Sequence, residues 1–137
     1  MAAFSSYLGK QTLDWILGGA SATQPANRWV GLAVGTPTSD GSAGAAAGSE
    51  MGTLTGYSRL TGLFGAANSP AGTASNTAAM TFGPFSSVGS ALGCHLWDGS
   101  PRGSSNMLLW GTLQTARTFG IGDSLVFSAG ALTVTLS

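Results

Sequence analysis

The residues of this chain that could do chemistry are few and scattered. Among 137 residues it contains one histidine, His95, one cysteine, Cys94, and five acidic residues. A Ser-His-Asp triad would need His95 beside a serine nucleophile, but the G-x-S-x-G turn is absent and Asp98 follows only three residues later. If residues 91–97 form a strand, Cys94 and His95 point to opposite faces, which opposes a Cys-His pair. We therefore expect His95 to face solvent or an interface, and the chain not to be an enzyme.

A metal site needs several histidine, cysteine or carboxylate ligands that converge. This chain offers isolated carboxylates instead, of which Asp98 and Asp123 lie in glycine-containing turns. A carboxylate in such a turn commonly accepts backbone hydrogen bonds, and a weak calcium site is the alternative. Neither of the two glycine-rich phosphate motifs occurs, and the five basic residues are scattered rather than gathered into a stripe. We therefore expect no metal, no cofactor and no direct contact with nucleic acid.

The composition points to assembly rather than to catalysis. Only 7% of the residues are charged and the net charge is zero, whereas soluble domains usually carry about 25% charged residues. A surface of serine, threonine, glycine and alanine is poorly protected against association. Either the chain is simply small and glycine-rich, or neighbouring protein covers much of its surface, and we favour the second interpretation. No apolar run predicts a membrane span and no leader predicts secretion, so we expect a protein made in the host cytoplasm without membrane contact.

The elements that must position these residues begin with one helix. The spacing of apolar residues predicts it over residues 4–17, with Ser5 or Ser6 capping its start. Gly18 and the following glycine supply the left-handed backbone that commonly ends a helix. A helix of this length is marginal alone, so it must dock on its own domain or on a neighbour.

The rest of the chain reads as short strands separated by turns. After a strand at residues 28–34, residues 35–56 have no periodicity, and loops longer than about 12–15 residues are usually functional or disordered. We predict that this loop orders against a partner. The regular strand spacing predicts an all-β fold, an antiparallel β-sandwich in the form of a jelly roll of about eight strands, with one short N-terminal α-helix. Further strands are expected at residues 57–64, 76–82, 91–97, 107–113, 115–119, 124–128 and 131–136.

This pattern predicts a single domain that begins with an arm. Residues 1–19 are expected to form an N-terminal helical arm, and residues 20–137 the β-sandwich domain. In the first strand, alternation predicts that Val30, Leu32 and Val34 face the core.

Four tryptophans stand out in so small a chain. Trp29, Trp97 and Trp110 fall on predicted strands, and Trp15 falls on the predicted helix. Packing in a core or a subunit interface is the commoner use of tryptophan. Stacking on sugars or bases is the alternative.

The order of several short motifs resembles that of a known family. The chain opens with F-S-S-Y-L…L-D-W…G-G and W-V-G-L-A-V-G-T-P-T-S-D-G. It continues with G-Y-S-R-L, A-A-M-T-F and L-L-W-G-T-L-Q-T-A-R-T-F, and it closes with G-I-G-D-S-L-V-F-S-A-G-A-L-T-V-T-L. In this order the motifs resemble small tailed-bacteriophage virion proteins that are often labelled tail fibre proteins. The resemblance spans nearly the whole chain.

The resemblance implies a structural role in the virion. Fibre shafts tend to be repetitive, and this chain has no internal repeat, so we expect a capsid decoration (cement) protein on the head surface. It would stabilise the head by bridging subunits of the major capsid protein, and it would associate with further copies of itself as a trimer. The residues expected at these interfaces are Phe4, Tyr7, Trp15, Arg28 and Trp29.

Two alternatives from other functional classes stay open. The first is a tail or tail-fibre component that binds a host glycan through an exposed surface containing Trp97, Asp98, Arg102 and Trp110. The second is a hydrolase of cell-wall sugars, for which the sequence shows no catalytic set. The number of copies per virion separates a cement protein from a tail component, because a shell protein is present in hundreds of copies.

Overall fold

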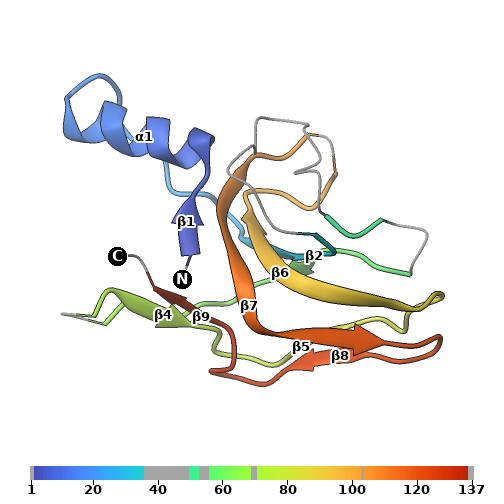
Figure 1. Ribbon diagram of the computed structural model, residues 1–137. Coiled ribbons are helices and arrows are strands. Elements are labelled where there is room, and N and C mark those ends of the chain that lie inside the picture. Colours follow the sequence, from blue (N-terminus) through green and yellow to red (C-terminus); the bar gives the residue numbers. More distant parts are fainter. Residues whose placement is uncertain (1, 36–49, 53–55, 69–70, 103, 136–137) are drawn as a thin grey trace.

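The largest element of the fold is an antiparallel sheet of five strands (Figure 1). The computed structural model describes residues 2–35, 50–52, 56–68, 71–102 and 104–135. The strand order is β1-β7-β6-β2-β3, so the first strand of the chain lies at one edge, beside one of the last. The strands are β1 (Ala2–Phe4), β2 (Trp29–Ala33), β3 (Leu60–Thr61), β6 (Gly89–Trp97) and β7 (Met107–Phe119).

Two short antiparallel ladders complete the β structure. They pair β4 (Thr73–Ser75) with β9 (Thr133–Thr135), and β5 (Met80–Phe82) with β8 (Leu125–Phe127). Figure 1 shows both ladders along the lower side of the molecule, away from the helix. The prediction of an all-β antiparallel fold with one short helix is confirmed. The described sheets have five, two and two strands, and the eight-strand jelly roll stays a prediction.

The main core joins the large sheet to these ladders. Val30 and Leu32 of β2 pack in one cluster with the phenylalanines of β5 and β8. The rings of Phe82 and Phe127 meet edge to face, with centroids 6.1 Å apart, and those of Phe85 and Phe119 stack at 3.8 Å. Aromatic contacts of this kind contribute free energy beyond the burial of their area. The ladders are therefore held to the large sheet by side chains.

The strand β7 is longer than the sequence predicted. The expected strands 107–113 and 115–119 are one continuous strand of 13 residues. Its pairing with β6 shifts register, since Thr112 pairs with Gly93 and Arg117 pairs with Ala91. An irregularity of this kind bends a strand, and Figure 1 shows β7 turning from the upper sheet toward β8.

Strand β2 is buried on both faces. Val30 and Leu32 face the main core, as predicted, but Gly31 and Ala33 on the other face are buried as well. Val34 was expected in the core and is instead 45% exposed, because the strand ends one residue earlier. The strand predicted at residues 57–64 is reduced to the two residues of β3.

The single helix, α1 (Ser6–Ile16), is shorter than predicted. Ser5 caps it, since its side chain accepts a hydrogen bond from the amide of Leu8 at 3.1 Å. Gly18 follows the helix with a φ of +79°, the left-handed conformation expected there. Phe4 lies in β1 rather than in the helix, because its backbone pairs with Leu109 of β7. The five-stranded sheet therefore begins inside residues 1–19, which the sequence analysis had assigned wholly to an arm.

Candidate interaction site

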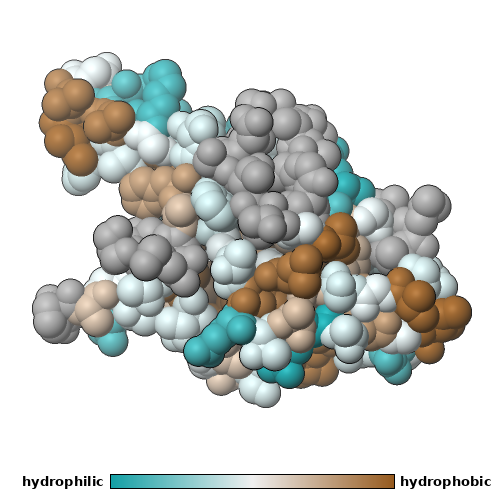
Figure 2. All heavy atoms as spheres, viewed as in Figure 1, coloured by the Kyte–Doolittle hydropathy of each residue, from teal (hydrophilic) through white to brown (hydrophobic). Residues whose placement is uncertain are grey.

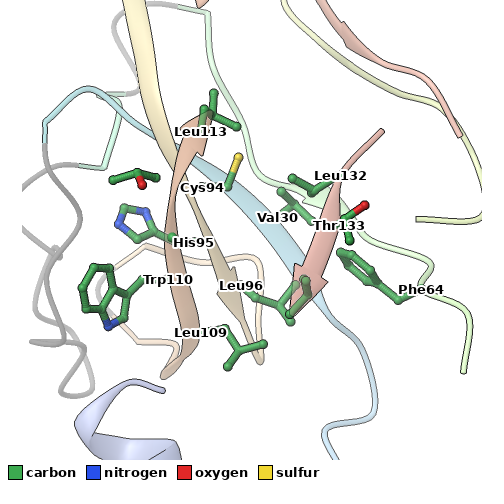
Figure 3. A pocket seen from close by; sticks show the side chains of 13 residues that line it. Val30, Phe64, Cys94, His95, Leu96, Leu109, Trp110, Leu113, Leu132 and Thr133 are labelled. Carbon is green, nitrogen blue, oxygen red and sulfur yellow. The ribbon is translucent and has the colours of Figure 1, made fainter. Parts of the chain in front are cut away.

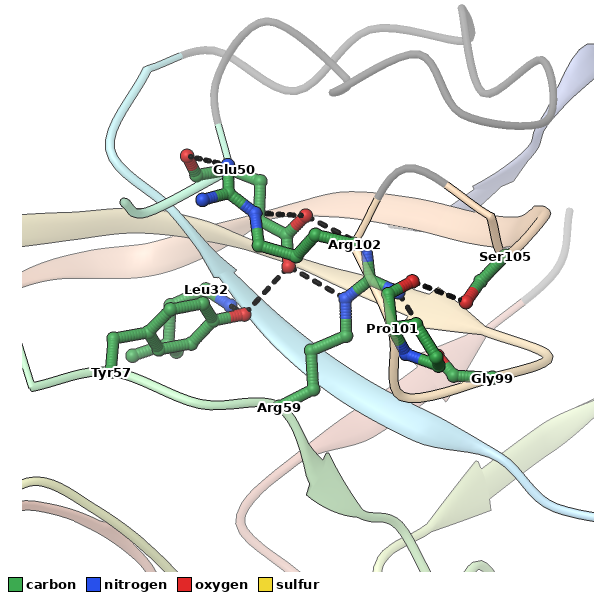
Figure 4. Close-up of polar contacts among 8 residues, drawn as sticks. All are labelled: Leu32, Glu50, Tyr57, Arg59, Gly99, Pro101, Arg102 and Ser105. Carbon is green, nitrogen blue, oxygen red and sulfur yellow. Dashed lines mark hydrogen bonds and ion pairs between the residues drawn. The ribbon is translucent and has the colours of Figure 1, made fainter. Parts of the chain in front are cut away.

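A buried ionic cluster holds the chain against the second face of the large sheet. We call Glu50, Tyr57, Arg59 and Arg102 the Glu50 clamp (Figure 4). Arg59 donates to both carboxylate oxygens of Glu50, from Nε to Oε1 at 2.7 Å and from Nη2 to Oε2 at 2.8 Å. The Tyr57 hydroxyl donates to Oε1 of Glu50 at 2.9 Å and accepts from the Leu32 amide at 3.1 Å. Arg102 adds a longer contact, from Nε to Oε2 at 3.4 Å.

Arg59 also ties the clamp to the loop that follows β6. Its Nη1 donates to the carbonyl oxygens of Gly99 at 3.0 Å and Pro101 at 3.2 Å. Its guanidinium carbon lies 3.7 Å from the centre of the Trp97 ring, within cation–π range. The planar guanidinium can serve the carboxylate, the carbonyls and the ring together, which a lysine could not do. One side chain therefore connects Glu50 with residues 97–101, which lie far away in sequence.

Glycine is required where β2 passes this cluster. A Cβ at Gly31 would lie 2.6 Å from Oη of Tyr57, and 3.1 Å from both Oε1 of Glu50 and Nε1 of Trp97. No side chain fits there unless the hydroxyl moves. The clamp thus depends on a residue type that the sequence analysis treated only as part of a strand.

Glu50 and Tyr57 of the clamp each keep one protonation state near neutral pH. Burial alone would raise the pKa of Glu50, but the hydrogen bonds and charges of Arg59, Tyr57 and Arg102 more than offset it, so that the pKa lies below its ordinary value. Burial and the Glu50 charge raise the pKa of Tyr57, which stays neutral. The Glu50 carboxylate is ionised with both oxygens engaged, so its role is to hold the loop in place.

His95 does not face solvent or an interface, as the sequence predicted, but is buried. Its side chain is 1% exposed, and burial lowers its pKa to about 4. Its ring meets that of Trp97 edge to face at 5.7 Å. Trp97 is also 1% exposed, so the expected glycan surface is wrong in its use of this ring. Both residues are covered because segments from the clamp pack over the face of β6 that was expected to be open.

A small apolar cleft lies on the other face of β6 and β7 (Figure 3). Cys94 and Leu96 point into it, opposite Leu132 and Phe64, while His95 points to the far side of the sheet. The cleft holds about 70 Å³, which is room for a few water molecules at most. Burial raises the pKa of the Cys94 thiol to about 12, so this thiol is unreactive at neutral pH.

The residues predicted for subunit interfaces do not form one surface. Phe4 and Trp15 are exposed, at 39% and 63%. Trp29 is half-buried in a second core cluster, where it packs against Trp97 and Met107. The residues predicted for subunit interfaces are thus divided between the exposed N-terminal segment and a closed core.

A groove brings together two residues from different predicted sets. Tyr7 of the expected interface and Asp98 of the expected glycan surface both line a groove of about 450 Å³ between α1 and residues 22–26. Asp98 already accepts from the amide of Asn106 at 2.7 Å and from its Nδ2 at 2.8 Å. Gln11 adds a polar side chain to the groove wall. Arg102, which was expected beside Asp98, belongs instead to the Glu50 clamp.

Four exposed apolar residues gather at the C-terminal end of α1. We call Leu13, Trp15, Ile16 and Leu17 the apolar tip; they are 58%, 63%, 63% and 78% exposed. None of the residues of α1 is buried. Figure 1 shows the helix projecting from the body, and Figure 2 shows a hydrophobic patch covering its far end. A side-chain cluster of this kind marks an interaction surface more often than not.

The comparison with known families decides the class of this protein. The family model of the podophage GP4 fiber I protein gp80 matches residues 3–135. The chain belongs to this family. The match confirms the resemblance found in the sequence, that of a phage virion structural protein. No curated protein matches the chain.

In this member of the gp80 fibre family, the structure describes neither a metal centre nor a membrane helix. Within the described ranges, no group of three histidine, cysteine or acidic residues could hold a metal ion. No helix in the same ranges is long and apolar enough to cross a membrane.

Sequence reasoning missed the Glu50 clamp in this fibre protein. Glu50 lies within the segment 35–56, which was assigned to a loop ordered by a partner, and residues 36–49 lie outside the described part of the chain. One signal was available. Glu50 and Arg59 flank Tyr57 in a chain with only ten charged residues, and a rare acid and base so close together are candidates for a buried pair.

Proposed function

We propose that this chain is a subunit of the phage tail-fibre apparatus that works by assembly, with α1 as the assembly arm and the β body as the presented part. The observation that carries this proposal is the apolar tip. It stands on a helix without any buried residue, beyond the edge of the sheet. An element so apolar gains its free energy by contact with another protein surface.

The Glu50 clamp of the β body supports this assignment of assembly to α1 and presentation to the body. The Glu50 clamp, with both side chains of the Glu50–Arg59 pair at most 1% exposed, fixes the loops to the sheet without leaving a free acid or base in it. Removing one partner of such a pair is costly, so the clamped loops stay in one arrangement. A rigid body on an apolar arm suits a structural subunit, and we propose that the chain is not an enzyme.

The number of copies per virion tests the location. Quantitative mass spectrometry of purified particles would give copies in threes, sixes or twelves for a tail-fibre subunit. Hundreds of copies, near the number of major capsid protein subunits, would contradict the tail-fibre proposal and support the capsid decoration role expected from the sequence.

A second candidate function is supported by the groove beside α1. Tyr7, Gln11 and Asp98 combine an aromatic ring, an amide and a carboxylate along one hollow, a mixture that can stack on and hydrogen-bond to a neutral sugar. We propose host-glycan recognition there. On a glycan array, the Tyr7→Ala variant should lose the signal and Tyr7→Phe should keep it. Equal binding by both variants and the parent chain would place the glycan elsewhere.

A further inference from the structure

Two exposed aliphatic side chains stand at the end of the body that lies away from α1. Val88 precedes β6, Ile121 lies in the turn between β7 and β8, and each is 74% exposed. We call this pair the body tip. Figure 1 places the start of β6 and the turn after β7 at the right-hand end of the molecule, and Figure 2 shows a hydrophobic patch at that end. The body tip is therefore an apolar surface separate from the apolar tip of α1.

Hydrogen bonds hold the two segments of the body tip side by side. The amide of Gly122 donates to the carbonyl of Phe85 at 2.8 Å, and the amide of Phe85 donates to the carbonyl of Asp123 at 2.9 Å. Beneath them Phe85 stacks on Phe119, with ring centroids 3.8 Å apart, and Phe119 pairs with the first residue of β6. The two exposed side chains are thus displayed on a base that is fixed by backbone bonds and by a buried aromatic pair.

The turn that carries Ile121 satisfies much of its own backbone. The Gly120 amide donates to the Asp123 carboxylate at 2.7 Å, and the Asp123 amide donates back to the Gly120 carbonyl at 3.2 Å. The Gly122 amide is bonded to Phe85, as described above. Polar groups without a partner make the transfer of a peptide out of water costly. Because these amides are satisfied within the chain, the turn can enter a less polar layer at low cost.

We propose that the body tip is a contact site for a lipid bilayer, and that the side chains of Val88 and Ile121 insert between its headgroups. The proposal rests on the proposed function in treating the β body as the presented part of the chain, and it names a surface that this part contacts. The sequence predicted no membrane contact, because no apolar run is long enough for a span. A peripheral contact through two turns requires no such run.

The size and the composition of the body tip favour lipid over protein. Two side chains with these exposures present an apolar area on the order of 200 Å², whereas each partner of a stable protein interface contributes about 800 Å². The residues that dominate protein interfaces are mostly tryptophan, tyrosine and arginine, and valine is rare among them. A fluid bilayer needs no matching pocket, and each aliphatic side chain that leaves water stabilises the contact.

The charges at this end of the body favour a neutral lipid surface. Arg117 and Asp123 are the charged residues of the segments 83–91 and 117–124, and both are exposed. Their opposite charges cancel, so no net charge draws this end toward an anionic lipid or a nucleic acid. The two phenylalanines of these segments are buried, so neither ring is presented for stacking on a sugar. The contact should therefore depend on apolar burial, and salt should change it little.

Flotation of the full chain with neutral phosphatidylcholine vesicles tests the proposal. The parent chain should float with the vesicles equally well at low and at high salt. A variant with Val88→Ser and Ile121→Ser should lose about tenfold or more of its binding and keep the circular dichroism of the parent, since both side chains are exposed. A matched control, with Val34→Ser and Leu63→Ser, removes two aliphatic side chains outside the tip that are 45% and 60% exposed. It should float like the parent.

A fluorophore keeps the proposal falsifiable if the double variant does not fold. An environment-sensitive dye on Ile121→Cys should brighten when vesicles are added, whereas the same dye on Leu63→Cys should not. The proposal is overturned if the parent chain does not float at either salt concentration, if the control variant loses as much binding as the body-tip variant, or if only the dye on the control cysteine responds.

The apolar tip of α1 is the other apolar surface that vesicles could reach. A variant with Trp15→Ser and Ile16→Ser removes two of its side chains, each 63% exposed, and it should float like the parent. If this variant alone stops floating, the bilayer contact belongs to α1 and the proposal is overturned.

Incorporation into virions separates this inference from the function on which it rests. The body-tip variant should enter particles normally, and the α1 variant should be lost from them. If the α1 variant is lost but the parent chain does not bind vesicles, the lipid contact fails and the assembly arm stands. If the body-tip variant is lost and the α1 variant is retained, another virion protein covers the body tip, and both proposals are wrong.

Discussion

At the scale of single residues, Glu50 is the point where the buried charges of the molecule meet. Its carboxylate accepts from Arg59, Tyr57 and Arg102, and its side chain is fully buried. Taking these charges out of water is costly, and their mutual contacts offset that cost only while every partner is present. The clamp therefore specifies one arrangement of the loops, and the loss of any of its side chains lowers the free energy of unfolding.

We expect Glu50→Gln to lower the free energy of unfolding by about 3 kcal/mol, because it leaves the buried guanidinium of Arg59 without a counter-charge. Urea denaturation followed by tryptophan fluorescence would measure it. The matched control is Asp14→Asn, which breaks the exposed pair with Lys10 and should cost less than about 1 kcal/mol. Similar losses in the two variants would show that the clamp does not stabilise the fold.

The close approach at Gly31 gives a second residue-scale prediction. Gly31→Ala should be strongly destabilising in the parent chain, because the new Cβ would lie 2.6 Å from Oη of Tyr57. In a Tyr57→Phe background that oxygen is absent, so the same change should cost less. A double-mutant cycle on unfolding free energies measures this coupling. Strictly additive losses would mean that the hydroxyl does not set the limit at Gly31.

The buried imidazole of His95 predicts a loss of stability in mild acid. Its pKa is about 4 in the folded chain, lowered by burial and by the charge of Arg59 against the opposing charge of Glu50, and about 6.5 when unfolded. The unfolded state therefore binds more protons between these values. Stability should be full above pH 6.5 and should fall by roughly 3 kcal/mol as the pH drops toward 4.

The variant His95→Gln isolates this contribution. Its unfolding free energy should change much less than that of the parent between pH 6.5 and pH 4.5, measured by urea titration at each pH. Below that window the clamp adds a further loss, because Glu50, whose folded pKa is lowered, becomes protonated. Parallel curves for parent and variant above pH 4.5 would contradict the assignment to His95.

At the scale of elements, α1 is held at its start and free at its end. Ser5 is fully buried, and four hydrogen bonds join it to backbone groups. Its amide donates to the carbonyl of Leu108 at 2.9 Å and its hydroxyl donates to the carbonyl of Met107, while its carbonyl accepts from the amide of Gly9 at 2.9 Å and its hydroxyl accepts from the amide of Leu8. Gly9, in the middle of the helix, has open space around its Cα. The hydrogen bonds of Ser5 thus stabilise the start of the helix, whereas Gly9 lowers the stability of its middle.

Two substitutions should move the local stability of α1 in opposite directions. Ser5→Ala removes the cap and should cost about 1 kcal/mol, and Gly9→Ala should add about 0.5–1 kcal/mol through lower backbone entropy in the unfolded chain. Amide hydrogen exchange of residues 10–16 reads both changes, faster in the first variant and slower in the second. Unchanged exchange in both would show that contacts with other chains, not the helix itself, set its stability.

At the scale of the whole molecule, Cys94 reports on opening of the core. Its thiol is half-buried in the cleft, and burial raises its pKa to about 12, so a thiol reagent should label it slowly until the sheet and the ladders separate. If Glu50→Gln costs about 3 kcal/mol, labelling of that variant should be roughly 100-fold faster. Equally fast labelling of both chains would mean that the cleft opens locally.

The sequence predicted those parts of the fold that depend on near neighbours. The pattern of short apolar segments between turns predicted strands at β6 and at the start of β7, and Ser5 with Gly18 marked the two ends of α1. Each of these signals depends only on residues a few positions apart, so contacts with distant parts of the chain do not change it.

What was missed depends on contacts between distant segments. The second face of β6 was read as open, so His95 was expected at solvent or an interface, whereas residues around the clamp cover it. Trp97 is in a core cluster, as the favoured use of tryptophan predicted, and only the alternative glycan surface had placed it in the open. Phe4 was read as helical because nothing nearby in sequence reveals its pairing with Leu109. The Glu50–Arg59 pair itself spans a stretch without periodicity, where pattern analysis has nothing to measure.

The attachment of α1 to the sheet at Ser5 also determines how the molecule transmits a pulling force. A pull on the far end of α1 reaches the body at Ser5, which donates two hydrogen bonds to the first residues of β7, Met107 and Leu108. That strand is 13 residues long and pairs with β6 over most of its length. A pulling force on the helix would thus be distributed along the longest described strand of the sheet rather than concentrated on one loop.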